Sequence, residues 1–303
     1  MILYNMKPEI KTFKYNKNGY PFLLKEISCP PLQINVLGKL PEEKRPRIAV
    51  VGTRKATAEG RMLAKKISRQ LSELGAVIVS GLAMGIDTAA HEGALDGKSE
   101  TVAVLACGLD SIYPKQNENL ARQIIGTGGA IISEYPIGTP ALRNRFLERN
   151  RIISGLSIAT VVIEAPISSG ALVTARLAAE QGREVFVFPG PINHPNYRGS
   201  HKLIRDGARL AASLEDILED LPAAIFPKKN STELKQQKLD LNKITDKNQL
   251  SILKIINKAG RPLNIDKIAE LTKLEPQAIN QTIAFLVVND ALKETEKGYA
   301  INV

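Results

Sequence analysis

The feature that most restricts the fold of this chain is a regular alternation of short apolar segments with longer amphipathic ones. The longer segments, which lie between the short apolar ones, have apolar residues at helical spacing. They are residues 57–74, 84–95, 116–125 and 170–181, and Thr57 can cap the first of these helices. Uninterrupted apolar runs of strand length are typical of parallel strands buried on both faces. Repeated strand and helix predict an α/β fold with a doubly wound, mostly parallel sheet. Six strands are predicted: RIAVVG (47–52), GAVIVSG (75–81), TVAVLACG (101–108), GAIISE (129–134), IATVVIEA (158–165) and EVFVFPG (184–190).

The segments on either side of this alternation differ from it. Residues 1–45 are rich in Lys, Asn and Pro and predict an N-terminal extension that packs on the core. Residues 46–221 form the α/β domain, and the polar residues 222–245 are a linker. Residues 246–303 predict three helices, at 248–257, 264–271 and 276–289, and then two short strands around a turn near Lys297. This order of elements predicts a small winged-helix domain.

Charge and composition indicate the class of partner. The net charge is +10, and the two flanking stretches hold most of the excess, with 8 basic against 4 acidic residues in 1–45 and 5 against 2 in 222–245. A basic chain favours an acidic partner such as nucleic acid. Two cysteines and three histidines without metal spacing predict neither a disulfide framework nor a metal site. No apolar run approaches the ~18 residues of a membrane span, so we expect a cytoplasmic protein.

Three loops at the predicted carboxyl edge of the sheet contain glycines and hydroxyl groups. In an open α/β sheet ligands bind at this edge, where loops expose backbone N–H groups and helices begin. Glycine lets a phosphate approach the backbone, and hydroxyls add donors. The alternative is that these glycines only allow tight packing. The residues that we predict to form an anion-binding surface are Gly52, Thr53 and Arg54 after the first strand, Ser80, Gly81 and Gly85 after the second, and Ser169 and Gly170 after the fifth.

The segment LRNRFLERNRIISGL (142–156) combines four arginines with one acidic residue and a phenylalanine. On a helix, Arg143, Phe146, Asn150 and Ile153 share one stripe. Arginine pairs with phosphate and an exposed aromatic ring stacks on bases, which is the combination that single-stranded nucleic acid requires. The alternative is a surface helix with a core-facing Phe146. Arg149 shares a second stripe with Arg145. Arg149 and Arg151 could instead be structural in part, each holding a nearby carboxylate such as that of Glu134 or Glu164.

Catalysis has little support. The first loop lacks the glycines of GxGxxG, and no GxxxxGK[ST] is present, so dinucleotide binding and a P-loop nucleotidase are not predicted. Asp87 and Glu164 stand near strand ends, but an acid and base pair would need two carboxylates that face one another. Asp87 is as well explained as a residue that orients loop amides. We therefore predict no catalytic residues, no metal and no cofactor.

Four long motifs resemble the DNA-processing protein A family (DprA, also called Smf). They are VGTRKAT (51–57), SGLAMGIDTAAHEGAL (80–95), FLERNRIISGLS (146–157) and VIEAPISSGALVTARLAAEQGREVFVFPGP (162–191). The resemblance implies an extended Rossmann-like domain that binds single-stranded DNA in a basic pocket, forms a homodimer, and helps to load the recombinase RecA in homologous recombination and natural transformation. By motif it assigns strand contacts to Arg54, Arg143 and Phe146, and it places Ser169, Gly170 and Thr174 beside the same pocket.

The chain departs from the family pattern in several places. Members often have Lys where this chain has Arg143, and residues 1–45 are expected to be a reduced form of the N-terminal domain of many relatives. The third C-terminal helix, PQAINQTIAFLVVND, contains no Lys or Arg, so a protein contact or a regulatory role is expected there rather than duplex recognition. The apolar residues Leu203, Ile204, Leu210, Ala211 and Leu214, after the strand 184–190, are expected near the sheet edge as dimer surface.

Two other functions stay open from the sequence. One is a Rossmann-like nucleotide-processing enzyme of the phosphoribohydrolase type, although such enzymes would show a PGGxGT loop where this chain has APISSGALVT (165–174). The other is a scaffold that binds RecA without DNA.

Overall fold

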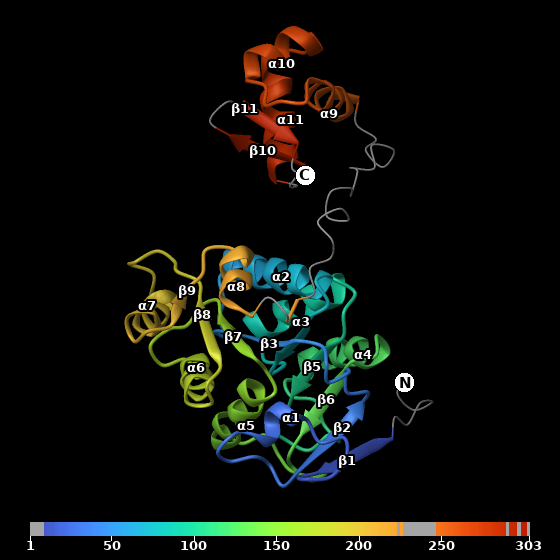
Figure 1. Cartoon of the computed structure of the whole chain (residues 1–303), viewed down its shortest axis with the longest axis vertical. Coiled ribbons are helices and arrows are strands. Elements are labelled where there is room, and N and C mark those ends of the chain that lie inside the picture. The colour runs from blue at the N-terminus through green and yellow to red at the C-terminus, as the bar shows by residue number, and fades with distance from the viewer. Residues whose placement is uncertain (1–8, 223–224, 227–246, 289–290, 296–297, 302–303) are drawn as a thin grey trace. The chain divides into compact units, whose positions relative to one another are not determined.

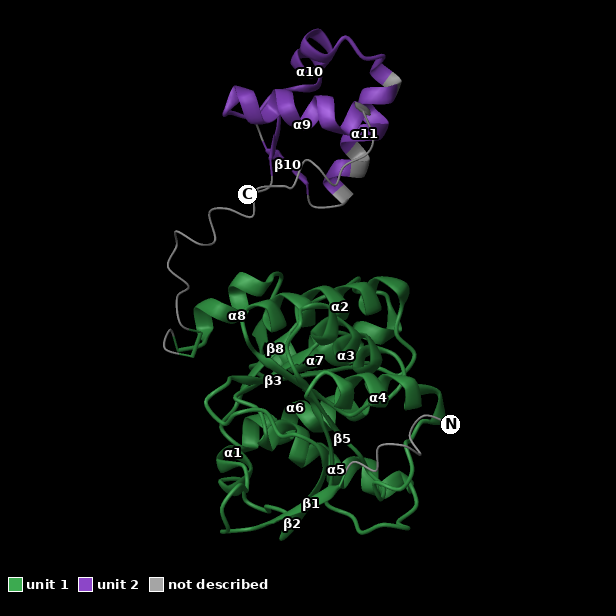
Figure 2. Cartoon of the chain, turned by 90° about the vertical axis from the view of Figure 1, so that its right-hand side faces the viewer, with its two compact units in different colours: residues 1–227 green, residues 228–303 purple. Residues whose placement is uncertain are grey.

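The computed structural model describes residues 9–222, 225–226, 247–288, 291–295 and 298–301. The chain forms two compact units, Met1–Pro227 and Lys228–Val303 (Figure 2). Each unit has its own hydrophobic core. Within the described residues, no helix has both the length and the apolar character that crossing a membrane requires.

The larger unit is built on a nine-stranded sheet with the order β1-β2-β6-β5-β4-β3-β7-β8-β9 (Figure 1). Strands β3 to β9 pair parallel with one another, which confirms the predicted α/β fold with its doubly wound, mostly parallel sheet. Each observed strand is shorter than the predicted one, because residues at one or both ends of the apolar run belong to the flanking loops. The strands are β1 (Ile10–Lys14), β2 (Gln33–Gly38), β3 (Arg47–Val51), β4 (Val77–Ser80), β5 (Thr101–Val104), β6 (Ala130–Ser133), β7 (Ala159–Val162), β8 (Glu184–Val187) and β9 (Arg209–Leu210).

Helices cover both faces of the sheet, and this explains why the strands are apolar throughout. In β3, Ala49 and Val51 face one core, with α1, α5 and α6, while Ile48 and Val50 face the other, with α2, α3 and α8. Figure 1 shows these two sets of helices on opposite sides of the sheet. The helices of this unit are α1 (Phe22–Lys25), α2 (Ala58–Glu73), α3 (Ile86–Asp96), α4 (Glu118–Gly126), α5 (Arg143–Gly155), α6 (Gly170–Glu180), α7 (Arg198–Arg205) and α8 (Leu214–Asp220), with two short 3-10 helices at Lys115–Asn117 and Pro195–Tyr197.

The order of the strands reverses at β3. From this strand the chain first builds outward through β4, β5 and β6, and then returns to the other side of β3 with β7, β8 and β9. At such a switch point the loops after the two adjacent strands diverge and leave a crevice at the carboxyl edge of the sheet. The loops after β3 and β7 therefore define the place where a ligand is expected.

The N-terminal segment is more than an extension that packs on the core, because it adds two strands to the sheet. β2 pairs antiparallel with β6, and β1 pairs antiparallel with β2. Ile34 and Val36, alternate residues of β2, are buried in the core beside Leu24 of α1. The sequence prediction missed this strand because the Lys, Asn and Pro residues around it are typical of loops.

Two local predictions can be compared directly with the structure. Thr57 does cap α2, because its hydroxyl accepts a hydrogen bond from the Gly60 amide at 2.9 Å. The residues expected to form an apolar dimer surface do not form one exposed patch. Strand β9 pairs with β8, and Leu203, Ala211 and Leu214 are buried in the cores of this unit. Among the five residues, Leu210 is exposed, at 52%. Apart from Leu210, these residues pack in or against the cores of this unit, which explains their apolar character.

The smaller unit has three helices followed by a two-stranded antiparallel sheet: α9 (Lys247–Ala259), α10 (Ile265–Thr272), α11 (Pro276–Val288), β10 (Leu292–Thr295) and β11 (Gly298–Ile301). Asn264 caps α10 by accepting a hydrogen bond from the Lys267 amide at 2.9 Å. This is the order of elements that the sequence predicts, and the assignment as a winged helix stays a prediction. The predicted turn at Lys297 lies outside the described residues.

Candidate functional site

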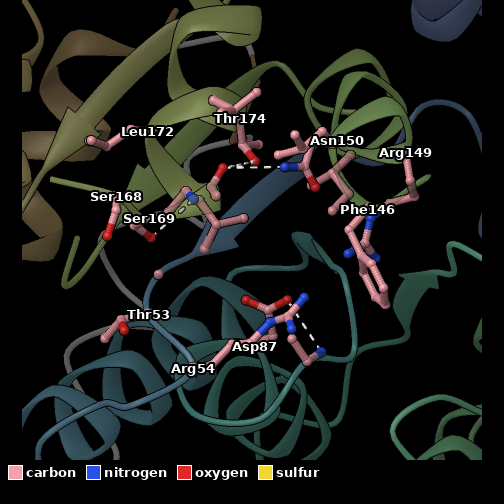
Figure 3. Close-up of a pocket in the computed structure, with 18 of the residues that line it drawn as sticks. Thr53, Arg54, Asp87, Phe146, Arg149, Asn150, Ser168, Ser169, Leu172 and Thr174 are labelled. Atoms are coloured by element: carbon pink, nitrogen blue, oxygen red, sulfur yellow. Dashed lines mark hydrogen bonds between the residues drawn. The ribbon is translucent and has the colours of Figure 1, made fainter. Parts of the chain in front are cut away.

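A pocket of about 750 Å³ lies at the switch point of the sheet. It is enclosed by the loops after β3 and β7 and by helices α5 and α6, and Figure 3 shows its side chains arranged around a common space. The residues that line it include five basic side chains and one acidic side chain, Asp87. We call it the arginine pocket. Its basic residues are Arg54, Lys55, Arg143, Arg149 and Arg176.

Phe146 lies at the centre of the cationic and aromatic side chains of the pocket. The Arg54 guanidinium lies over its ring, 4.8 Å from the centroid, and the ring of Tyr113 is 5.4 Å away with an interplanar angle of 56°. Phe146 is only partly buried and lines the pocket, so the alternative of a core-facing phenylalanine does not hold. Arg54 is exposed. Together they present an aromatic face and a positive charge to the same space.

The helix stripe predicted from the sequence is correct. Arg143, Phe146, Asn150 and Ile153 all line the pocket from α5. Arg145 is not among the lining residues, and its guanidinium instead lies 5.3 Å from the ring centroid of Tyr135. The first turn of α5 therefore presents its basic side chains in two directions.

Arg149 lines the pocket but is 4% exposed, and its guanidinium is committed to the protein. It donates hydrogen bonds to the carbonyl oxygens of Gly81, at 2.9 Å, and Val104. Burial lowers the pKa of Arg149 to about 10, an effect that nearby Asp87 opposes, so the side chain is still a cation at neutral pH. The sequence prediction was wrong about its alternative partner, because Arg149 holds two carbonyls on the strand ends rather than Glu134 or Glu164.

Arg151 behaves as that alternative predicted, since it forms an ion pair with Glu134. Both side chains are largely buried. This pair ties α5 to the end of β6 and lies outside the lining of the arginine pocket.

Asp87 orients loop amides. Its carboxylate accepts hydrogen bonds from the amides of Gly81, at 3.1 Å, and Ala83, at 3.4 Å. Burial raises the pKa of Asp87, and Arg149 and these two amides oppose that shift. The Asp87 carboxylate is thus already bound to backbone amides, and it is the single acidic side chain among the residues that line the pocket.

Glu164 holds the loop that carries Arg54. Its backbone carbonyl accepts from the Thr53 amide at 2.7 Å, and its carboxylate accepts from the amide and hydroxyl of Thr57. Asn196 donates to the same carboxylate at 2.9 Å and to the Lys55 carbonyl at 3.0 Å, and the Tyr197 hydroxyl donates at 3.0 Å. Burial alone would raise the pKa of Glu164, but these hydrogen bonds outweigh it and the pKa lies below its usual value.

Three of the predicted glycines are explained by protein packing. A Cβ at Gly52 would collide with Ile86, one at Gly81 with the Arg149 guanidinium, and one at Gly85 with the carbonyl oxygen of Thr53 at 2.4 Å. Gly85 also has a φ of +84°, which only glycine adopts readily. Gly170 differs, because its Cβ would meet only the Asn150 amide nitrogen, at 3.8 Å, and the residue is exposed in the pocket.

The predicted polar residues divide in the same way. The Ser80 hydroxyl is buried and donates to the Val50 carbonyl, so Ser80, Gly81 and Gly85 support the site from behind and are absent from its lining. Asn150 donates to the Gly170 carbonyl at 3.2 Å, and the Thr174 hydroxyl donates to the same oxygen at 3.3 Å. Ser169 caps α6 by accepting from the Ala171 amide. The N-terminus of α6, the positive end of its dipole, therefore faces the pocket.

Three lining residues with basic or aromatic side chains were missed by sequence reasoning. Lys55 is the next residue after Arg54, and Arg176 lies on α6 one turn after Leu172 and Val173, which also line the pocket. Tyr113 belongs to the loop after β5, which was not among the three loops predicted to form the anion-binding surface. An aromatic residue directly before Pro114 was the available signal, and only the fold reveals its contact with Phe146.

Comparison with known proteins gives a consistent result. The family model described as DNA recombination-mediator protein A matches residues 11–222. Protein Smf of Escherichia coli is 44% identical over 202 residues, which are 67% of this chain and 54% of that protein. DNA processing protein DprA of Streptococcus pneumoniae is 43% identical over 209 residues, 69% of this chain and 73% of that protein. The matched part of the chain thus spans about half of the Escherichia coli relative.

Two solved structures are similar to the larger unit. DNA processing protein A from Streptococcus pneumoniae superposes with a TM-score of 0.65 at 38% identity, covering 73% of this chain and 77% of that one. DNA processing protein A from Helicobacter pylori superposes with a TM-score of 0.61 at 29% identity, covering 71% and 97%. The Helicobacter pylori structure is described as giving insight into a unique single-stranded DNA binding mode.

Proposed function

Because this chain belongs to the DNA recombination-mediator protein A family, we propose that it binds single-stranded DNA in the arginine pocket and acts in homologous recombination without catalysing a reaction. The observation that carries this proposal is the contact of the exposed Arg54 with the partly exposed Phe146 in a pocket with five basic side chains and one acidic side chain. A cation pairs with the phosphate backbone, and a ring accepts any base by stacking. The DNA-binding description of the Helicobacter pylori relative supports it.

The strand contacts assigned to the pocket are of two kinds. Arg54, Arg143 and Phe146 offer side chains to the ligand, and Ser169 and Gly170 offer the N-terminus of α6 to a phosphate. Arg149, Asn150 and Thr174 contribute mainly by holding the walls in place. A ring that stacks on any base and cations that pair with phosphates do not distinguish one base from another, so binding is expected to depend little on sequence.

We propose further that the protein loads RecA on single strands during natural transformation. We also propose that it acts in the cytoplasm and as a homodimer. These proposals are supported by the family and by the ligand proposed for the pocket. RecA loading is tested by the rate at which RecA nucleates on an oligonucleotide with and without the protein, and the homodimer by the sedimentation mass at micromolar concentration. We assign a regulatory or protein-contact role to the smaller unit.

The first experiment is an electrophoretic shift with a short oligothymidylate, run beside a duplex of the same length and a nucleoside-monophosphate hydrolysis assay. The proposal predicts a shift with the single strand, a weaker one with the duplex, and no hydrolysis. Hydrolysis without a shift would favour the phosphoribohydrolase alternative. Absence of both activities, together with an effect on RecA, would favour the scaffold.

A further inference from the structure

A second pocket, of about 430 Å³, lies beside the first turn of α5 at the carboxyl edge of β6. Strands β1 and β2, the loop after β5 and the loop after β6 provide its walls, and none of the residues that line it is charged. The lining combines apolar residues, Leu109 and Ile137 among them, with the polar side chains of Thr12, Gln33 and Asn35. Such a lining suits an uncharged group with an apolar face and polar edges rather than a phosphate.

Tyr135 is an aromatic wall of this second pocket and is held firmly in place. Its hydroxyl donates to Glu148 at 2.8 Å, and its carbonyl accepts from the Asn35 amide at 3.0 Å. The Arg145 guanidinium lies 5.3 Å from its ring centroid. This arrangement repeats the contact of Arg54 with Phe146 in the arginine pocket, where the corresponding distance is 4.8 Å. A fixed ring with a guanidinium over it is the kind of surface on which a nucleobase stacks.

Two short segments connect the pockets. Arg145 and Phe146 are consecutive residues of α5, and the first contacts a wall of the second pocket while the second lines the arginine pocket. The loop after β5 contributes Leu109 to the second pocket and Tyr113 to the arginine pocket, where Tyr113 is 46% exposed. A helix with its side chains is ~10–12 Å across, which is roughly three stacked nucleotides at ~3.4 Å each. A strand of that length would cross the first turn of α5.

We propose that a single strand bound in the arginine pocket continues over the first turn of α5 and places a base in the second pocket against Tyr135. This inference rests on the proposed function. The exposed Arg143 at the start of α5 lies on the proposed path, where it can accompany the phosphates. In the second pocket the Asn35 amide is already bound to Tyr135 and Thr12, so it is Gln33 that offers polar groups to the edge of a base.

The test compares two lengths of fluorescent oligothymidylate with the full chain, by anisotropy at one salt concentration. About four nucleotides fill the arginine pocket alone, and about twelve reach beyond the first turn of α5. Tyr135→Ala should weaken binding of the long oligonucleotide by about 5- to 150-fold and leave the short one unchanged. Tyr135→Phe keeps the ring and should bind both as the unaltered protein does. Phe22→Ala removes an aromatic side chain that is 55% exposed on α1 and should change neither affinity.

Ile137→Asp provides a second variant if Tyr135→Ala lowers the melting temperature. Ile137 is 67% exposed and lines the second pocket, so the change adds a carboxylate there with little effect on folding. It should again weaken only the long oligonucleotide. An equal loss at both lengths, or no loss at the long one, overturns the second site while the arginine pocket stands. If the unaltered protein binds neither length, the proposed function itself fails, and the second site fails with it.

Discussion

The two ends of helix α5 use the same residue type for opposite purposes. Toward the C-terminal end, Arg149 is buried and bonded to two carbonyl oxygens, and Arg151 is paired with Glu134. At the N-terminal end, Arg143 is exposed beside the pocket, and Arg145 lies over the ring of Tyr135. An arginine that is buried and bonded to the protein supports the fold, whereas one that is exposed is available to a ligand. Counting basic residues in the motif would therefore overestimate the number of side chains that are available to a ligand.

Removing the buried arginine should produce the largest effect. Arg149→Ala leaves the carbonyl oxygens of Gly81 and Val104 without their donor and removes the cation that opposes the raised pKa of Asp87. A buried polar group that loses its partner costs about 1–3 kcal/mol, and two are lost here. We expect chemical denaturation to show that loss, with Arg143→Ala as a control that unfolds like the unaltered protein. If Arg149→Ala is as stable as the control, the assignment of Arg149 to the scaffold is wrong.

Phe146 tests the exposed end of the helix. Stacking on a base predicts that Phe146→Ala weakens oligonucleotide binding by about 1–3 kcal/mol, with a nearly unchanged dependence on salt. Because the ring is only partly buried, the melting temperature should change little. Phe146→Tyr keeps the ring and is the matched control. A variant that melts early but binds normally when folded would contradict the stacking contact and favour a packing role for Phe146.

Glu164 extends the same comparison to the facing wall, where a buried carboxylate holds the loop and the exposed Arg54 is proposed to contact the ligand. If Glu164 acts through Arg54, Glu164→Gln should weaken oligonucleotide binding when Arg54 is present. The same substitution should have no further effect when it is added to Arg54→Ala. A double-mutant cycle measures this coupling, expected at about 0.5 kcal/mol or more. Strictly additive losses would contradict a positioning role.

Glu164 also predicts a dependence of stability on pH. Its pKa is lowered from the ordinary 4.5, so the stability it contributes is present above that pH and is lost as the pH falls through the lower value of the folded state. The free energy of unfolding of Glu164→Gln should therefore fall less steeply than that of the unaltered protein below about pH 4.5. Parallel curves for the two proteins would show that the carboxylate is not held as described.

The periodicity of apolar residues and the position of the loops were sufficient to predict the parallel sheet and the edge where the pocket lies. Periodicity and loop position can be read from short stretches of the sequence. The stripe of Arg143 and Phe146 on α5 followed from helical spacing alone. What could not be predicted depends on contacts distant in sequence: Gly81 is small because Arg149 lies against it, and Tyr113 joins the site through the ring of Phe146. Strand β2 was missed because β6, the strand with which it pairs, is also distant in sequence.

The central claim is that phosphates of a single strand are bound in the arginine pocket by exposed side chains. The most direct test is the salt dependence of oligonucleotide affinity for the double variant Arg54→Ala, Arg143→Ala, compared with the unaltered protein. Each phosphate contact on a single strand contributes roughly 0.7 to the slope of log affinity against log salt, so the account predicts a slope smaller by about 1.4. An unchanged slope in a variant that is fully folded would contradict it.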